Sequence, residues 1–117
     1  MSTNSQIAFA PFGNTVVIAA DVAAPSGVQT PVFTPFAAQE TGQIRVVNAS
    51  VNVVHLGIGS TAALAQTNAV AATAGNPAKG IPLLAGAVEI LRVAPGSFIS
   101  GAASAASTVY VTPGQGL

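Results

Sequence analysis

Short apolar runs separated by turn residues constrain the fold of this chain more than any other feature. The runs are rich in Val, Ile and Phe, and clusters of Gly, Pro, Asn and Ser divide them. They recur about every ten residues, which is the spacing of short strands joined by turns. This pattern predicts an all-β fold.

The regular spacing also predicts the architecture. Regularly spaced short strands are typical of a sandwich or a barrel, and we expect an antiparallel β-sandwich, jelly-roll-like, with about eight strands. Pro31 and Pro35 make one of them, residues 28–36, an edge strand or an arm, since proline cannot donate to a sheet. The expected strands are residues 7–10, 15–20, 28–36, 43–49, 52–58, 87–93, 97–102 and 107–112, with 81–84 as a further short one.

Three connections are expected from their turn residues. Residues 11–14 would close the first strand, and residues 113–117 would follow the last one as a terminal turn. Residues 48–51 are short enough for a hairpin, so we expect 43–49 to pair with 52–58.

The chain has 117 residues, the length of one domain. We expect an extended N-terminal arm, 1–12, and a single β-sandwich domain, 13–117, with a long excursion at 59–80. This excursion is mostly Ala, Thr, Asn and Gln, and its larger apolar residues Leu64 and Val70 are six positions apart. That spacing is poor for one helical face, so we expect a loop with about one helical turn.

Charged residues make up only 5% of the chain, against about 25% in an average soluble domain. The net charge is zero, which excludes a basic nucleic-acid-binding module and a polybasic membrane anchor. We expect no signal peptide, since Met1–Ser5 has no Lys or Arg, and no membrane span, since no window of about 20 residues is wholly apolar. Synthesis in a cytoplasm is therefore expected. The charged residues are Asp21, Glu40, Arg45, Lys79, Glu89 and Arg92.

Few residues are available for chemistry. There is no cysteine, and His55 is the only histidine, so we predict no enzyme, no catalytic residue, no cofactor and no metal site. We expect His55 to be a polar residue on an exposed or interface strand face. We expect Glu89 to meet Arg45 or a cation of another chain, and to lie on the opposite face of its strand from Arg92.

Several expected strands are apolar on both faces, as in residues 15–20 and 43–49. A lone molecule would expose these side chains to water, and large exposed apolar surfaces mark partner interfaces. We therefore expect the chain to associate with other protein, with a homodimer favoured and a trimer as the alternative.

Four blocks in the second half resemble a group of small tailed-bacteriophage head proteins. They are Gln43–Ala49, Val53–Gly57, Pro82–Glu89 and Ser107–Gly116, which occur in this order. The resemblance implies a capsid cement (head decoration) protein. Such a protein binds the outer surface of a shell made of HK97-type major capsid protein, clamps neighbouring capsomers and is not an enzyme.

Two segments and two strands are predicted to contact the capsid: the N-terminal arm, the excursion at 59–80, and the strands that carry the arginines. Two alternatives remain open, a phage tail, fibre or baseplate β-module and, in another class, a small ligand- or sugar-binding β-sandwich. The predicted partner-binding residues are Ile7, Phe9, Phe12, Arg45, Leu64, Lys79 and Arg92.

Overall fold

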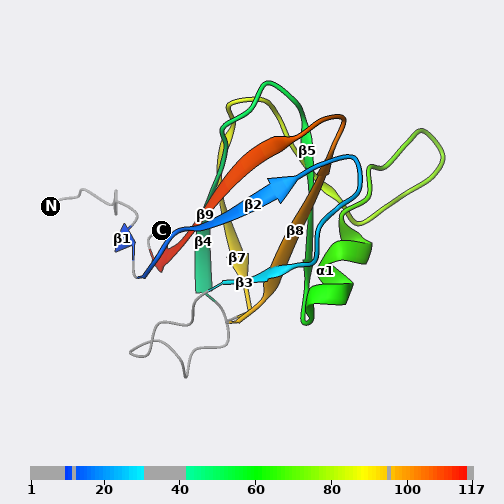
Figure 1. Ribbon diagram of the computed structural model, residues 1–117. Coiled ribbons are helices and arrows are strands. Elements are labelled where there is room, and N and C mark those ends of the chain that lie inside the picture. The colour runs from blue at the N-terminus through cyan, green and yellow to red at the C-terminus, as the bar shows by residue number, and fades with distance from the viewer. Residues whose placement is uncertain (1–9, 12, 31–41, 95, 116–117) are drawn as a thin grey trace, which may run out of the picture.

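The computed structural model describes residues 10–11, 13–30, 42–94 and 96–115. In these segments two antiparallel sheets face each other, with one short helix outside them (Figure 1). The five-stranded sheet contains β1 (Ala10–Pro11), β2 (Val16–Ala20), β4 (Gly42–Asn48), β7 (Val88–Val93) and β9 (Ser107–Gln115). The four-stranded sheet contains β3 (Val28–Gln29), β5 (Val54–Gly59), β6 (Ile81–Leu83) and β8 (Phe98–Ala103). The helix is α1 (Ala62–Asn68).

The order of the strands is that of a jelly roll. β1 and β2 follow each other along the same edge of β9, so they occupy one strand position. The two sheets then have the orders β2-β9-β4-β7 and β3-β8-β5-β6, with four positions each. Two nested four-stranded sheets connected in this way form a jelly roll, which confirms the predicted fold class.

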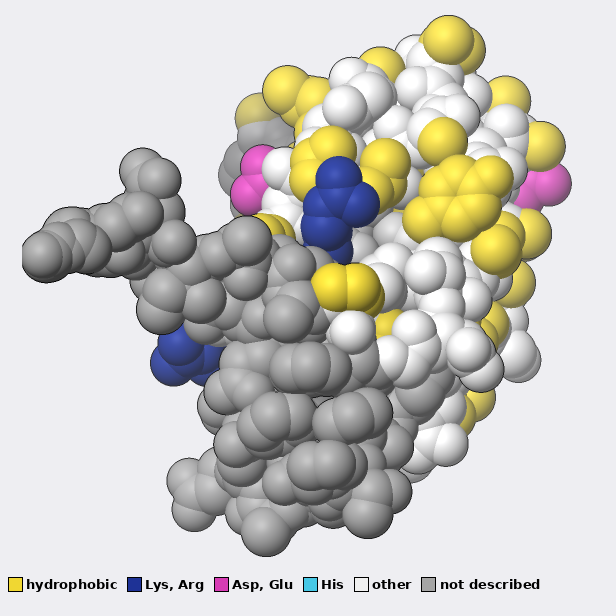
Figure 2. Space-filling model, turned by 90° about the vertical axis from the view of Figure 1, so that its left-hand side faces the viewer, with side chains coloured by type: hydrophobic (Ala, Val, Ile, Leu, Met, Phe, Trp, Pro, Cys, Tyr) yellow, Lys and Arg dark blue, Asp and Glu magenta, His cyan; other side chains and the backbone are white. Residues whose placement is uncertain are grey.

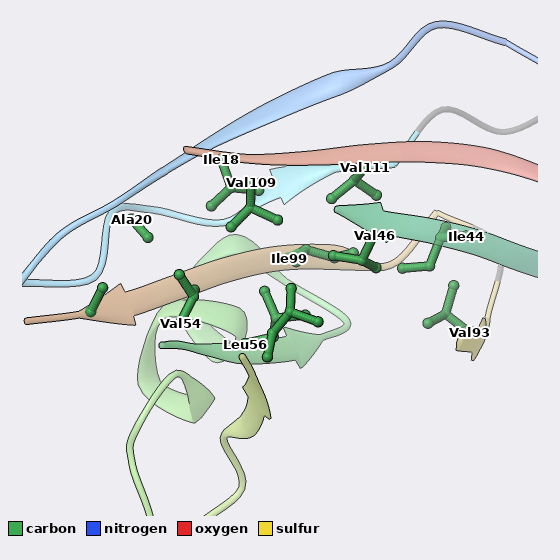
Figure 3. Packing of buried hydrophobic residues seen from close by; sticks show 12 residues of the cluster. Ile18, Ala20, Ile44, Val46, Val54, Leu56, Val93, Ile99, Val109 and Val111 are labelled. Carbon is green, nitrogen blue, oxygen red and sulfur yellow. The ribbon is translucent and has the colours of Figure 1, made fainter. Parts of the chain in front are cut away.

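The core lies between the sheets and is aliphatic. Ile18, Val46 and Val109 of the five-stranded sheet face Leu56 and Ile99 of the other, all fully buried (Figure 3). Each such side chain contributes about 1.5–3 kcal/mol on burial. Alternate residues of β4 and β5 point inward as the sequence predicts, and Val, Ile, Leu and Ala suffice to fill the space.

The predicted hairpin between residues 43–49 and 52–58 is wrong. β4 pairs with β7 and β9, whereas β5 pairs with β6 and β8, so the chain crosses between sheets at this point. The buried Asn48 holds the crossing. Its Nδ2 donates to the carbonyl oxygens of Asn52 (2.8 Å), Leu83 (2.9 Å) and Leu84 (3.0 Å). A short connection permits a hairpin, but here these bonds direct the chain into the other sheet.

Parts of two predicted turns belong to strands instead. β9 continues through Pro113 and Gly114, and Pro11 belongs to β1 rather than to a turn. Pro113 is tolerated in this inner strand because neither β1 nor β2, which share one edge of β9, pairs with it. β1 ends with Pro11 opposite Gly114, and β2 begins with Val16 opposite Val111. Of the expected arm, 1–12, the structure describes only Ala10–Pro11.

The remaining strands agree with the expected positions. β3, β5, β6, β7 and β8 each lie within or overlap the predicted range. β3 is an edge strand of its sheet, as the prolines after it predict, although Pro31 and Pro35 lie outside the described residues.

The excursion contains a longer helix than the sequence predicts. α1 has seven residues, and its N-cap is Thr61, whose Oγ1 accepts a hydrogen bond from the backbone N–H of Leu64 (3.1 Å). Its buried residues are Ala65 and, directly after its end, Ala69. A Cβ at Gly57 would collide with the backbone of both, so the helix packs closely on the four-stranded sheet. No helix in the described segments is long and apolar enough to cross a membrane.

An exposed hairpin follows α1. The Gly80 N–H donates to the carbonyl of Val70 (3.0 Å) and closes its base. Two further backbone hydrogen bonds join Thr73 and Asn76 across its tip (3.2 and 2.9 Å). Gly75 occupies the tip with φ of +78°, which glycine adopts without strain. In Figure 1 this hairpin projects on the side of the molecule that carries α1.

Candidate functional site

The two sheets differ in what covers their outer faces. α1 packs against β5 and β8 and covers the outer face of the four-stranded sheet. Among the described residues, no element packs on the outer face of the five-stranded sheet. This face is therefore the first candidate for contact with another molecule.

A row of apolar side chains crosses this open face. The strand register places Val17 opposite Tyr110, Tyr110 opposite Val47, and Val47 opposite Val88. Val17 is 51% exposed, Tyr110 42%, Val88 46% and the adjacent Ile90 49%. We call Val17, Val47, Val88, Ile90 and Tyr110 the apolar face. Figure 2 shows this side of the molecule, with hydrophobic side chains on both sides of a basic one.

Arg45 lies beside this row on the same face. It is exposed and belongs to β4, an inner strand, where it stands opposite Thr112 of β9 and Ile90 of β7. The hydroxyl of Thr112 is hydrogen-bonded to that of Thr15 at 2.8 Å. Neither cross-strand neighbour of Arg45 is an anion, so among the described residues of its sheet none stands opposite it as a counterion.

The two charged residues of β7 point to opposite sides. Arg92 stands opposite Gln43 on the outer face, and Glu89 stands opposite the buried Val46. This arrangement of Glu89 and Arg92 agrees with the prediction. The expected contact between Glu89 and Arg45 is wrong, because Arg45 stands opposite Ile90, on the other side of the sheet from Glu89.

The structure separates the predicted partner-binding residues into two groups. Arg45 and Arg92 share the outer face of the five-stranded sheet. Leu64, 46% exposed on α1, and the exposed Lys79 belong to the excursion that packs on the other sheet. A single flat partner surface cannot contact both groups.

Three further predicted residues cannot be placed. Ile7, Phe9 and Phe12 lie outside the described residues. Sequence reasoning in turn missed the residues of the apolar face as a group. The only sequence signal for this face was that some expected strands are apolar on both sides. Which residues form the row depends on the register of four strands that are far apart in the chain.

His55 lies on the opposite side of the sandwich. It is half-buried in β5 and borders a shallow cavity of about 430 Å³ lined also by Val22, Ala69, Val70 and Ala102, with Ala71, Ala103 and Ser104. Its Nδ1 is buried and has no hydrogen-bond partner. His55 is the only titratable residue of this lining, so no acid–base pair forms there. Within the described segments, no three His, Cys, Asp or Glu residues are grouped to hold a metal ion.

A scan of protein-family models finds no match to this chain, and neither a search of curated proteins nor a search of solved structures finds one.

Proposed function

We propose that this protein is a non-enzymatic structural protein of a tailed-bacteriophage virion. It binds the outer surface of the major capsid shell and clamps neighbouring capsomers. The observation that carries this proposal is the apolar face, an exposed row of aliphatic side chains around Tyr110 on a sheet that no described element covers.

An apolar sheet face suits a permanent mechanical contact. Burial of apolar surface contributes about 25 cal/mol per Å², and a standard interface covers about 800 Å² on each partner. On a symmetric shell the same contact repeats at every equivalent position, so a moderate affinity per copy stabilises the whole shell. Such a contact needs area and rigidity and requires no reactive group.

The jelly roll holds the face rigid. β9 and β4, which carry Tyr110 and Val47, are inner strands paired on both sides, and their alternate residues fill the core. A preformed surface loses little conformational entropy when it docks.

Three of the four blocks that resemble phage head proteins contribute to this face. Gln43–Ala49 overlaps β4, Pro82–Glu89 ends in β7, and Ser107–Gly116 includes β9, whereas Val53–Gly57 overlaps β5 of the other sheet. The three blocks contribute Arg45, Val47, Val88 and Tyr110. The resemblance expected from the sequence and the exposed face both support this proposal.

The test is co-sedimentation of the purified protein with expanded, undecorated phage heads. We expect saturation at a copy number close to that of the capsid protein, and loss of binding by a Val17→Asp variant, since it would bury an unpaired charge. Val70→Asp is the matched control: Val70 is 50% exposed, as Val17 is, but lies on the side of α1.

The control variant should bind as the wild type does, and both variants should unfold at the wild-type urea concentration. If the wild-type protein does not sediment with heads, the proposed function is wrong. Equal binding by Val17→Asp and the wild type would show that another surface makes the contact.

A further inference from the structure

At the centre of the outer face of the five-stranded sheet, apolar residues surround a cation, Arg45. Arg92 also points to this face and Glu89 points to the other side, while the exposed Asp21 follows β2 at the margin, beyond the pair of Ala20 with Ser107. Arg45 occupies an inner strand beside Tyr110, and the aliphatic residues of β2 and β7 flank the pair. Tyr and Arg near the centre of a patch, ringed by aliphatic side chains, is the composition of an interface hot spot.

This charge pattern disfavours contact between two copies of the face. A two-fold dimer centred on Arg45 would bring the guanidinium groups of both copies together, and neither described cross-strand neighbour of Arg45 is an anion. Burying cations without counterions is strongly unfavourable. If the expected homodimer forms, a different surface of the molecule makes it.

We propose that the apolar face docks on a protein surface that presents a carboxylate to Arg45, and not on a second copy of this chain. The inference rests on the proposed function and names the chemistry of the partner: an apolar surface with one Asp or Glu at the position opposite β4. The planar guanidinium of Arg45 binds such a carboxylate through two parallel hydrogen bonds. The pair sets the register of docking, while Val17, Val88, Ile90 and Tyr110 supply the apolar area.

Three charge variants test the pairing on undecorated heads. Arg45→Gln should weaken binding at least about 30-fold, because loss of one member of a buried charge pair costs about 2 kcal/mol or more and about 1.4 kcal/mol is tenfold. The affinity of Arg45→Lys should lie between those of the wild type and Arg45→Gln, since lysine keeps the charge but lacks the planar guanidinium group. Lys79→Gln is the matched control, as it removes one exposed cation from the side of α1 and should bind within about twofold of the wild type.

Charge reversal identifies the partner residue. Arg45→Asp should abolish binding to wild-type heads, and one Asp→Lys or Glu→Lys substitution on the outer surface of the shell should restore it. If wild-type protein binds heads and Arg45→Gln binds equally well, the inference is wrong while the proposed function stands. If no shell substitution restores Arg45→Asp, the inference is also wrong.

The free chain provides an independent test through its only tyrosine. The sequence has one Tyr and no Trp, so the emission of Tyr110 reports directly on the apolar face. We expect its quenching by acrylamide to stay constant as the protein concentration rises. Concentration-dependent protection of Tyr110 that Val88→Asp abolishes would show self-association through this face and overturn the inference, whatever the heads show. Absence of both self-association and head binding would overturn the inference together with the proposed function.

Discussion

At the scale of single residues, Asn48 determines where the chain crosses between the sheets. It is fully buried, and its side chain joins three segments of the chain. Its Oδ1 accepts hydrogen bonds from the N–H and the hydroxyl of Ser50, at 3.1 and 2.6 Å. All of its side-chain hydrogen-bonding groups thus have partners inside the protein, and they hold the turn at residues 50–52 against Leu83 and Leu84.

The first prediction follows from these bonds. Asn48→Ala should lower the free energy of unfolding by about 3 kcal/mol, since the partners of its two N–H bonds and of its Oδ1 lose their hydrogen bonds at about 1 kcal/mol for each of these three groups. Urea denaturation measures the change. Asn14→Ala, at an exposed asparagine, is the control and should stay within about 0.5 kcal/mol of the wild type. A small effect at both positions would mean that water replaces the Asn48 side chain.

The sequence correctly places Asn48 on the inward side of its strand with Ile44 and Val46. What it cannot show is the partner, because the carbonyls of Leu83 and Leu84 lie 35 and 36 positions away. A polar residue on a core face therefore signals a hydrogen-bond partner without identifying it.

At the scale of elements, α1 depends on the sheet beneath it. A seven-residue helix is too short to be stable alone in water, and α1 gains its stability from packing on β5 and β8. Gly57 and Gly59 of β5 make this possible, since their lack of side chains lets the helix backbone lie directly on the strand.

Gly57→Ala is therefore expected to displace α1. The new methyl group would overlap the backbone at Ala65 and Ala69, and we expect a loss of about 2–3 kcal/mol. Hydrogen exchange at the amides of Ala65 and Ala69 should accelerate more than in the rest of the protein. Gly75→Ala is the comparison: its methyl group would meet nothing within 4 Å and should cost only the backbone strain of its positive φ, about 1–2 kcal/mol. Unchanged protection of α1 in Gly57→Ala would contradict this account.

The elements differ in how well the sequence predicts them. β2, β4 and β7 contain runs of β-branched and large aliphatic residues, and their positions were predictable within a residue or two. The sequence predicts too short a helix because its only large apolar residues in this region, Leu64 and Val70, are exposed and do not mark the buried face. Its buried face consists of alanines, which carry little signal unless the glycines of the opposing strand are known.

At the scale of the whole molecule, the sandwich has two unlike sides. One side carries the apolar face and Arg45, and the other carries α1, the exposed hairpin and the cavity beside His55. The sequence predicted Arg45 and Arg92 as contact residues but grouped them with Leu64 and Lys79. Composition and pattern identify which strands have apolar surfaces; only the register and the layering show which of them share a side.

The hairpin at 70–80 lies on the side away from the proposed contact. Because the bond between Gly80 and Val70 closes its base, changes at the tip should not reach the core. A peptide of about ten residues inserted between Ala74 and Gly75 should lower the free energy of unfolding by less than about 1 kcal/mol, since loop entropy grows slowly with length. Urea denaturation and head binding would both be measured, and loss of either would contradict the expected independence of the hairpin.

This closed base makes the protein suitable for presenting foreign sequences. If the protein attaches to a capsid as proposed, a peptide carried at the tip would stand on the outward side of every attached copy, at the regular spacing of the particle and accessible to antibodies. Dense, ordered arrays of this kind bind multivalent receptors far more strongly than single copies do.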